Sequence, residues 1–146
     1  MKVLLLNGPN LNWLGKRQPE IYGKLTLAEV EANLRACATE AGVALEAVQS
    51  NSEGEIVDAV QQASERGFSG AVVNAGAYSH TSIALRDAFL GTGLPFVEIH
   101  ISNIHAREPF RRQTLLSDVA IGSVVGFGVY GYELALRGLL AQLKPR

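Results

Sequence analysis

All three histidines of this chain lie in two short segments that also carry several arginines. His80 follows an apolar stretch that ends at Asn74, while His100 and His105 lie at and just after a second apolar stretch. Imidazole titrates near neutral pH and can act as a general acid or base, whereas guanidinium groups bind small anions. Together the two segments predict a polar pocket with local positive charge, suited to a small anion. The alternative is a rim of solvated loops, which are normally polar.

His100 is the main candidate for acid–base chemistry in these segments. Glu98 precedes it by two positions, and side chains two apart on a strand point to the same face. A carboxylate beside the ring would orient or charge it, so that His100 could act as a general acid near neutral pH. Two alternatives stay open: a structural histidine with satisfied hydrogen bonds, and a weak metal site of Glu98, His100 and His105.

A tyrosine and an arginine in the connection 8–25 could form a second reactive pair. Arg17 precedes Tyr22 by five residues, and we expect no helix or strand in this connection. Such long connections are often functional, for example as lids. If the loop folds the two side chains together, the guanidinium would lower the phenol pKa from about 10 and make a tyrosinate base feasible. Otherwise the tyrosine only anchors the loop.

Two further features have simpler structural explanations. Gly126, Gly128 and Gly131 match the spacing of a dinucleotide-binding turn, but only about fifteen residues follow, with no second strand and no acidic residue at the usual distance. A tight turn with close helix packing explains them. Cys37 falls on the apolar face of a predicted helix, and we expect a buried, unreactive thiol there.

The alternation of strand and helix signals predicts an α/β fold. The expected strands are 3–7, 44–49, 70–74, 96–100 and 119–125. Capping boxes at Thr26 with Glu29 and at Ser52 with Glu55 open two helices that stop at glycines 42 and 67, and further helices are expected at 83–91 and 132–143. Short apolar strands of this kind form a parallel sheet with helices on both faces, most often in the flavodoxin-like order 2-1-3-4-5. Ligands bind such sheets beyond the carboxyl ends of the strands, which is where the candidate residues lie.

Composition excludes several classes of function. The chain has 146 residues, 47% hydrophobic and 18% charged, so we expect one domain, 1–146, with a sizeable core. A net charge of −1 gives no bulk attraction to nucleic acid or to a membrane surface. One cysteine excludes an internal disulfide framework, and the first apolar run is too short for a secretory signal or a membrane span. A cytoplasmic protein is the default expectation.

Several separated motifs make a more specific pattern. They are Asn7-Gly8-Pro9-Asn10-Leu11-Asn12, Arg17, Glu20-Ile21-Tyr22-Gly23, Gln49–Gly54, Asn74–Ser82, Arg86-Asp87-Ala88, Glu98–Asn103 and His105–Glu108. In type and order they resemble the signature of the type II 3-dehydroquinate dehydratases across essentially the whole chain. The resemblance implies a flavodoxin-like fold and a lyase without cofactor or metal. Its reaction is the conversion of 3-dehydroquinate to 3-dehydroshikimate and water in the shikimate pathway of aromatic amino acid biosynthesis.

The resemblance also implies catalytic roles. Tyr22 would remove the proton alpha to the ketone, and Arg17 would keep that tyrosine ionised. A water bound near Asn10 would hold the enolate. His100 would protonate the departing hydroxyl, giving an anti elimination, and Glu98 would support the imidazole.

A further set of residues is implied to bind the substrate. The substrate carboxylate would be held by Asn74 and the backbone at Ile101 and Ser102, and the ring hydroxyls by His80, Asp87 and Arg111; Gly76 and a lid-contacting Arg107 complete the set. The family forms a homododecamer built from trimers, and the leucine-rich segment 132–143 weakly favours an oligomer. Trp13 and Gln18 differ from the leucine and glutamate that are frequent at these lid positions.

Two other classes of function remain as alternatives. One is a non-catalytic flavodoxin-like module that binds a small anion or a nucleotide. A receiver domain of this fold would need acidic residues where this chain has Asn7 and Asn74. The other is an assembly protein that uses the leucine-rich last helix.

Overall fold

The computed structural model describes residues 1–16 and 18–143, and of Tyr22 only the backbone. Its centre is a parallel sheet in the order β2-β1-β3-β4-β5, which confirms the expected 2-1-3-4-5 topology. The strands are β1 (Lys2–Asn7), β2 (Ala44–Gln49), β3 (Gly70–Asn74), β4 (Phe96–His100) and β5 (Gly122–Val125). The register aligns Asn7 with both Gln49 and Asn74, so the central strands end at the same edge of the sheet.

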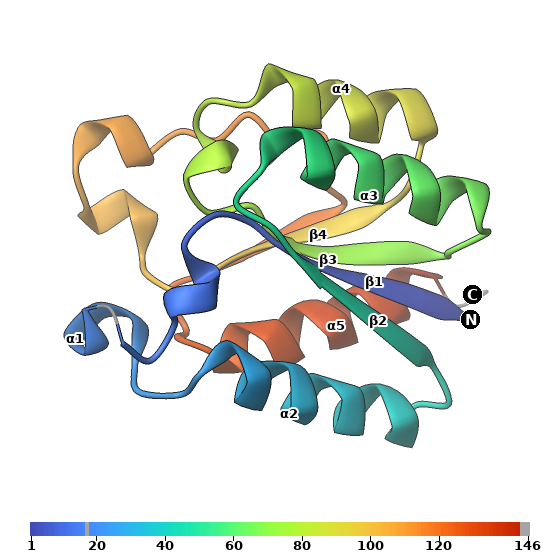
Figure 1. Cartoon of the computed structure of the whole chain (residues 1–146), viewed down its shortest axis with the longest axis horizontal. Coiled ribbons are helices and arrows are strands. Elements are labelled where there is room, and N and C mark those ends of the chain that lie inside the picture. Colours follow the sequence, from blue (N-terminus) through green and yellow to red (C-terminus); the bar gives the residue numbers. More distant parts are fainter. Residues whose placement is uncertain (17, 144–146) are drawn as a thin grey trace.

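Two helices cover each face of the sheet. In Figure 1, α3 (Glu53–Glu65) and α4 (Ile83–Thr92) lie above the strands, and α2 (Leu27–Glu40) and α5 (Tyr130–Leu143) lie below them. Alternate side chains of a strand point to opposite faces, so β1 supplies Val3 and Leu5 to the cluster under α2 and α5. It supplies Leu4 and Leu6 to the cluster under α3 and α4. The apolar strands are therefore buried on both faces.

Side-chain caps fix where three helices begin. Thr26 accepts a hydrogen bond from the backbone N–H of Glu29, and Ser52 accepts one from that of Glu55, each at 3.3 Å. Both helix starts were expected from the sequence. A third cap, Ser82, is fully buried and accepts from the N–H of Leu85 at 2.9 Å.

The first strand begins one residue earlier than expected and α4 ends one residue later, and three further expectations were wrong by more than that. The fifth strand begins at Gly122 and not at 119, because residues 116–120 form a turn closed by the N–H groups of Val119 and Ala120 on the Leu116 carbonyl. α5 begins two residues earlier than expected, at Tyr130. The connection 8–25, expected to lack structure, contains a 3₁₀ turn (Leu11–Trp13) and the short helix α1 (Pro19–Tyr22). Proline at the first position suits a helix start because its φ is already helical.

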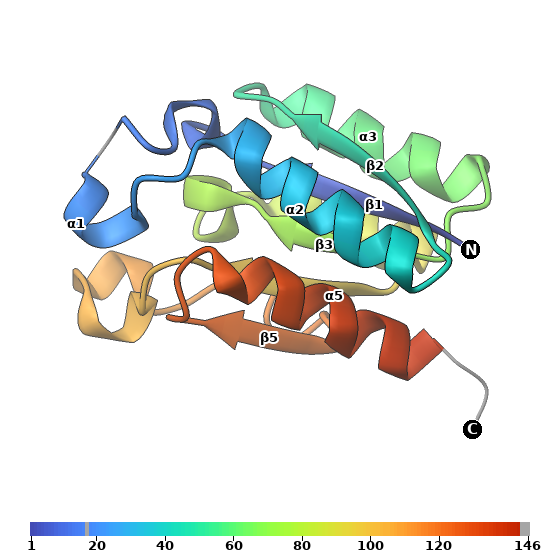
Figure 2. The ribbon, with the colours of Figure 1, turned by 90° about the horizontal axis from the view of Figure 1, so that it is seen from below.

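The leucines of α5 pack within the chain itself. Leu136, Leu139 and Leu140 are buried in the cluster that α5 shares with α2. The two helices lie side by side on one face of the sheet (Figure 2). Cys37 packs half-buried against the same cluster, and burial raises the pKa of its thiol. Among the described residues, no helix has the length and apolar character needed to cross a membrane.

Candidate active site

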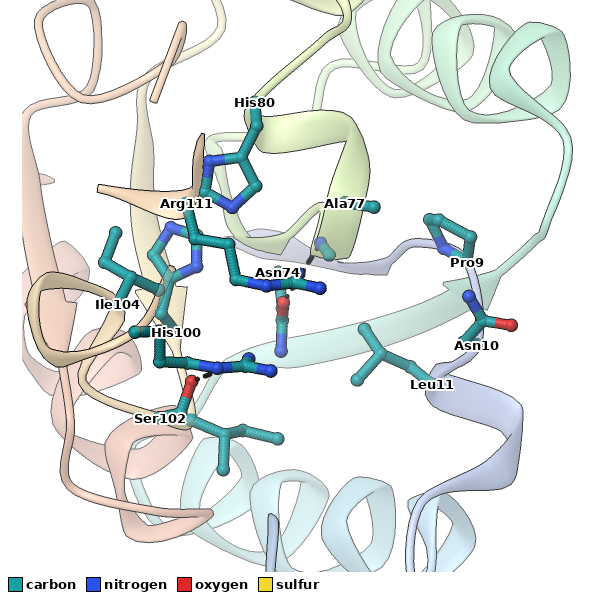
Figure 3. Close-up of a pocket in the computed structure, with 13 residues that line it drawn as sticks. Pro9, Asn10, Leu11, Asn74, Ala77, His80, His100, Ser102, Ile104 and Arg111 are labelled. Atoms are coloured by element: carbon teal, nitrogen blue, oxygen red, sulfur yellow. Dashed lines mark hydrogen bonds between the residues drawn. The ribbon is translucent and has the colours of Figure 1, made fainter. Parts of the chain in front are cut away.

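A pocket of about 170 Å³ opens beyond the carboxyl ends of β1, β3 and β4. This is the position expected for a ligand site in a sheet of this order. Figure 3 shows side chains from three separate segments turned toward this space. The lining residues are Pro9, Asn10, Leu11, Asn74, Gly76, Ala77, His80, His100, Ile101, Ser102, Ile104, Arg107 and Arg111.

The segments that directly follow β1 and β3 are in close contact with each other beside this pocket. Gly8 donates its N–H to the Asn74 carbonyl at 2.8 Å, and a Cβ on Gly8 would lie only 2.3 Å from the carbonyl oxygen of Ala75. The next turn holds Asn10 in the left-handed region, with φ of 68°, and its N–H donates to Asn51 Oδ1 at 3.0 Å. This close approach brings Asn10 to the same pocket as Asn74.

His100 and Glu98 form a buried pair at the end of β4. His100 Nε2 lies 3.0 Å from Glu98 Oε2, out of line for a well-directed hydrogen bond, and neither atom has another partner among the described residues. The other carboxylate oxygen is surrounded by the hydroxyls of Ser117, Thr114 and Ser123. Burial raises the pKa of Glu98, but the contact with His100 and the hydroxyls of Ser117 and Thr114 outweigh it and hold the pKa below its usual range. An ionised carboxylate therefore supports the ring and leaves Nδ1 for a ligand.

His80 lines the pocket, and one hydrogen bond fixes which of its ring nitrogens carries the proton. Its Nδ1 lies 2.7 Å from the carbonyl oxygen of Gln113. A carbonyl only accepts, so Nδ1 carries the proton and Nε2 of the neutral ring is an acceptor. The ring centroids of His80 and His100 are 6.1 Å apart, so one small molecule can reach both.

Two arginines give the pocket positive charge. Arg107 Nη1 donates to Ser102 Oγ at 3.4 Å, and Arg111 Nε donates to Glu108 Oε2 at 2.8 Å. The bond from Arg111 contributes most to holding the pKa of Glu108 below its usual range. The amide side chains of Asn10 and Asn74 and the two imidazole rings supply further polar groups, so the pocket suits a polyhydroxylated anion.

The structure gathers most of the residues expected from the sequence. Those that line the pocket are Asn10, Asn74, Gly76, His80, His100, Ile101, Ser102, Arg107 and Arg111, and Glu98 lies behind His100. Asp87 is not among them: it lies on α4 and lines a different hollow, shared with α3. Arg17 and the side chain of Tyr22 lie outside the described residues, although the backbone of α1 lies at the same end of the molecule as residues 104–111 (Figures 1 and 2).

Some contributors to the site were not foreseen from the sequence. Thr114, Ser117 and Ser123 carry no motif, and only the folded chain brings their hydroxyls to Glu98. The open alternative of a metal site gains no support, because across 1–16 and 18–143 no three histidine, cysteine, aspartate or glutamate side chains gather as metal ligands would.

The fold and the pocket define an α/β protein of flavodoxin-like architecture with a polar pocket, lined by histidines and arginines, at its strand ends. Residues 1–140 match the model of the family described as dehydroquinase class II. A 3-dehydroquinate dehydratase of Alkalilimnicola ehrlichii is 56% identical over 142 residues, which cover 97% of this chain and 93% of that protein. Catabolic 3-dehydroquinase 1 of Aspergillus terreus is 55% identical, with the same coverage of both chains.

Solved structures give the same result. The crystal structure of type II dehydroquinase from Butyrivibrio crossotus superposes with a TM-score of 0.94 at 40% identity, covering 96% of this chain and 97% of that one. The corresponding enzyme from Propionibacterium acnes gives a TM-score of 0.91 at 41% identity, covering 96% of each chain. This chain belongs to the class II dehydroquinase family. It is therefore an enzyme, and the non-catalytic alternatives are not supported.

Proposed function

We propose that this chain, as one catalytic domain, dehydrates 3-dehydroquinate to 3-dehydroshikimate and water in the shikimate pathway. The observation that carries the proposal is the imidazole of His100, backed by a buried carboxylate, in a pocket sized for one small anion. A hydroxyl is a poor leaving group and needs a proton donor at this position. Family membership and the named relatives support the choice of reaction.

The pocket offers a group for each part of this substrate. We assign the carboxylate to the side-chain amide of Asn74 and the backbone N–H groups of Ile101 and Ser102. His80 Nε2 can accept from a ring hydroxyl, since its other nitrogen donates to Gln113. Arg111 binds a further hydroxyl, and Arg107 binds the lid.

The proposed chemistry moves two protons. Tyr22, kept ionised by Arg17, removes the proton alpha to the ketone. The electrons of that C–H bond form an enolate, which is held by a water at Asn10. The enolate then forms the ring double bond as the C1–O bond breaks. His100 gives its proton to the departing hydroxyl, which leaves as water on the opposite face. The roles of Tyr22, Arg17 and Asn10 rest on the family resemblance.

The remaining parts of the proposal concern the assembly. The family resemblance supports a cytoplasmic homododecamer built from trimers, working without cofactor or metal. Asp87 lies outside the pocket of its own chain, so it can contact substrate only if an assembly brings it to another copy. Light scattering after size exclusion tests the subunit number.

The test of the reaction follows the ultraviolet absorbance of the conjugated product when purified protein meets 3-dehydroquinate in the presence of EDTA. His100→Ala should reduce kcat by about 10² or more, the usual contribution of a general acid. His105→Ala is the matched control, because His105 is exposed and does not line the pocket. No turnover by the wild type, or wild-type turnover by His100→Ala, would overturn the proposal.

The proposed base has its own test. Tyr22→Phe removes only the phenol oxygen and should nearly abolish turnover, because no other group of comparable basicity is assigned to the alpha proton. Tyr130→Phe, at an exposed tyrosine, serves as control and should keep kcat within about twofold. Normal kcat in Tyr22→Phe would refute the assignment of the base.

A further inference from the structure

A buried chain of hydrogen bonds links α5 to the floor of the pocket. Tyr132, in the first turn of α5, is 1% exposed. Its hydroxyl donates to Asn7 Oδ1 at 2.6 Å and accepts from Asn74 Nδ2 at 2.9 Å. Asn7 ends β1 and Asn74 ends β3, so one phenol joins the two strand ends at the point where the chain reverses direction across the sheet.

The backbone fixes the direction of the bond between Asn74 and Tyr132. The N–H of Gly76 donates to Asn74 Oδ1 at 3.2 Å, and a backbone N–H can only donate. The oxygen of the Asn74 amide must therefore face Gly76, and its nitrogen must face Tyr132. Burial raises the pKa of Tyr132, so its hydroxyl keeps the proton that it donates to Asn7.

One N–H of Asn74 is left for the pocket. The amide nitrogen has two N–H groups, and the bonds of the described residues use one of them, toward Tyr132. Asn74 lines the pocket, and Figure 3 shows its side chain at the centre of the floor. The group presented there is therefore a donor. A flipped amide would present an acceptor, which repels a carboxylate and leaves the Gly76 N–H without its partner.

We propose that Tyr132 is a positioning residue that locks Asn74 with its N–H toward the pocket, and thereby makes the site select a carboxylate over a neutral carboxamide. The inference rests on the proposed function, in which Asn74 binds the substrate carboxylate. Tyr132 acts without touching the substrate, since it does not line the pocket.

The test compares two ligands that differ only at the group Asn74 would bind. Quinate and its neutral carboxamide, quinamide, are titrated against the wild type and Tyr132→Phe by calorimetry. The preference for quinate should fall about tenfold in the variant, as expected for loss of one hydrogen bond to a charged group, because the freed amide can also present its oxygen. The KM for 3-dehydroquinate should rise by a similar factor, with a smaller change in kcat.

Matched controls separate positioning from loss of stability. Leu139→Ala creates a defect in the same buried face of α5 without touching the hydrogen-bond chain, and it should keep the wild-type ligand preference. Tyr130→Phe removes an exposed phenol oxygen from the same helix and should do the same. An unchanged preference in Tyr132→Phe, or an equal fall in Leu139→Ala, would overturn the inference.

A second variant keeps the inference testable if Tyr132→Phe does not fold. Asn7→Ala removes the acceptor of the Tyr132 hydroxyl, which then turns its proton toward Asn74 and favours the flipped amide. The same fall in preference is expected, although Asn7 does not line the pocket. Where Tyr132→Phe does fold, the double variant of Asn7→Ala and Tyr132→Phe should lose less preference than the product of the two single effects, because both act on one chain of bonds. Independent effects would contradict this.

The two proposals fail in different ways. If the wild type turns over 3-dehydroquinate and the ligand preference is unchanged in Tyr132→Phe and Asn7→Ala, the role of Tyr132 is refuted and the proposed function stands. A wild type without turnover refutes the proposed function, and the inference falls with it.

Discussion

A single carboxylate has two different tasks at the end of β4. One oxygen of Glu98 faces His100 Nε2 at 3.0 Å, and the other is held by hydroxyls from the segment 114–123. The hydroxyls offset part of the cost of burying the charge, which is large for an unpaired ion. The imidazole can therefore be supported by a charge that is fixed in place.

Removal of one hydroxyl should move the pH dependence of the stability of the fold. Ser117→Ala takes away a hydrogen bond that lowers the pKa of Glu98, so that pKa should rise. The carboxylate is then protonated at a higher pH, and the acidic limb of the profile of unfolding free energy against pH should shift upward by part of a pH unit to about one unit. His80, Arg107 and Arg111 face the same pocket and are untouched by the change.

Ser64→Ala, which removes a hydroxyl on α3 far from Glu98, is the control for this profile. Its acidic limb should coincide with that of the wild type. Coincident limbs for Ser117→Ala and the wild type would show that the hydroxyl does not tune the carboxylate.

At the scale of elements, the site depends on how closely β1 and β3 leave the sheet. Gly8 has space for no side chain, because a Cβ there would lie 2.6 Å from the carbonyl carbon of Ala75. The carbonyl carbon and oxygen of Ala75 belong to the backbone, so neither atom can move away by a side-chain rotation. The segment that carries Asn10 therefore depends on a glycine that has no chemical role.

Gly8→Ala should lower the free energy of unfolding by about 1–3 kcal/mol, the usual cost of overpacking, and should also raise KM by displacing Asn10. Gly54→Ala is a matched control in α3, where the nearest atom to a new Cβ is Ser52 Oγ at 3.8 Å. That variant should gain up to about 1 kcal/mol from helix propensity. Urea unfolding measures both, and equal stabilities for the two variants would contradict the close approach.

The elements that the sequence predicted correctly are those whose signals are local. β2, β3 and β4 match their expected bounds, and the caps at Thr26 and Ser52 form as expected. The turn at 116–120 was missed, because its apolar residues at the start of the expected strand 119–125 are also typical of a strand. The contacts of Arg86 with this segment are not visible in the local sequence. Arg86 donates to the Leu115 carbonyl and to Asp118 and so fixes the segment from a distant helix.

The candidate site followed the same rule. Residues at strand ends meet once the sheet order is known, and this brought His80 and His100 into one pocket. Tyr132 and Ser117 could not be found this way, since their contacts with Asn74 and Glu98 depend on how later segments pack. Asp87 is the opposite case: its motif was recognised in the sequence, but within a single chain the residue does not reach the pocket.

At the scale of the whole molecule, the site and the core share β4. Every residue of this strand is buried, including Glu98 and His100. The Glu98 carboxylate therefore belongs to the structure that unfolds cooperatively, and its protonation must affect the stability of the whole fold.

The sign of this coupling follows from the pKa of Glu98, which lies below its ordinary value of 4.5 in the folded chain. The stability that the carboxylate contributes is complete above about pH 4.5 and is lost as the pH falls through the folded pKa. The free energy of unfolding of the wild type should therefore exceed that of Glu98→Gln at pH 6, and the difference should shrink as urea unfolding is repeated down to about pH 3. Glu46→Gln is the control: Arg66 also lowers the pKa of Glu46, but both side chains are about half exposed and the pair is screened by solvent. A constant gap between the wild type and Glu98→Gln across this range would mean that the buried pair does not stabilise the fold through its charge.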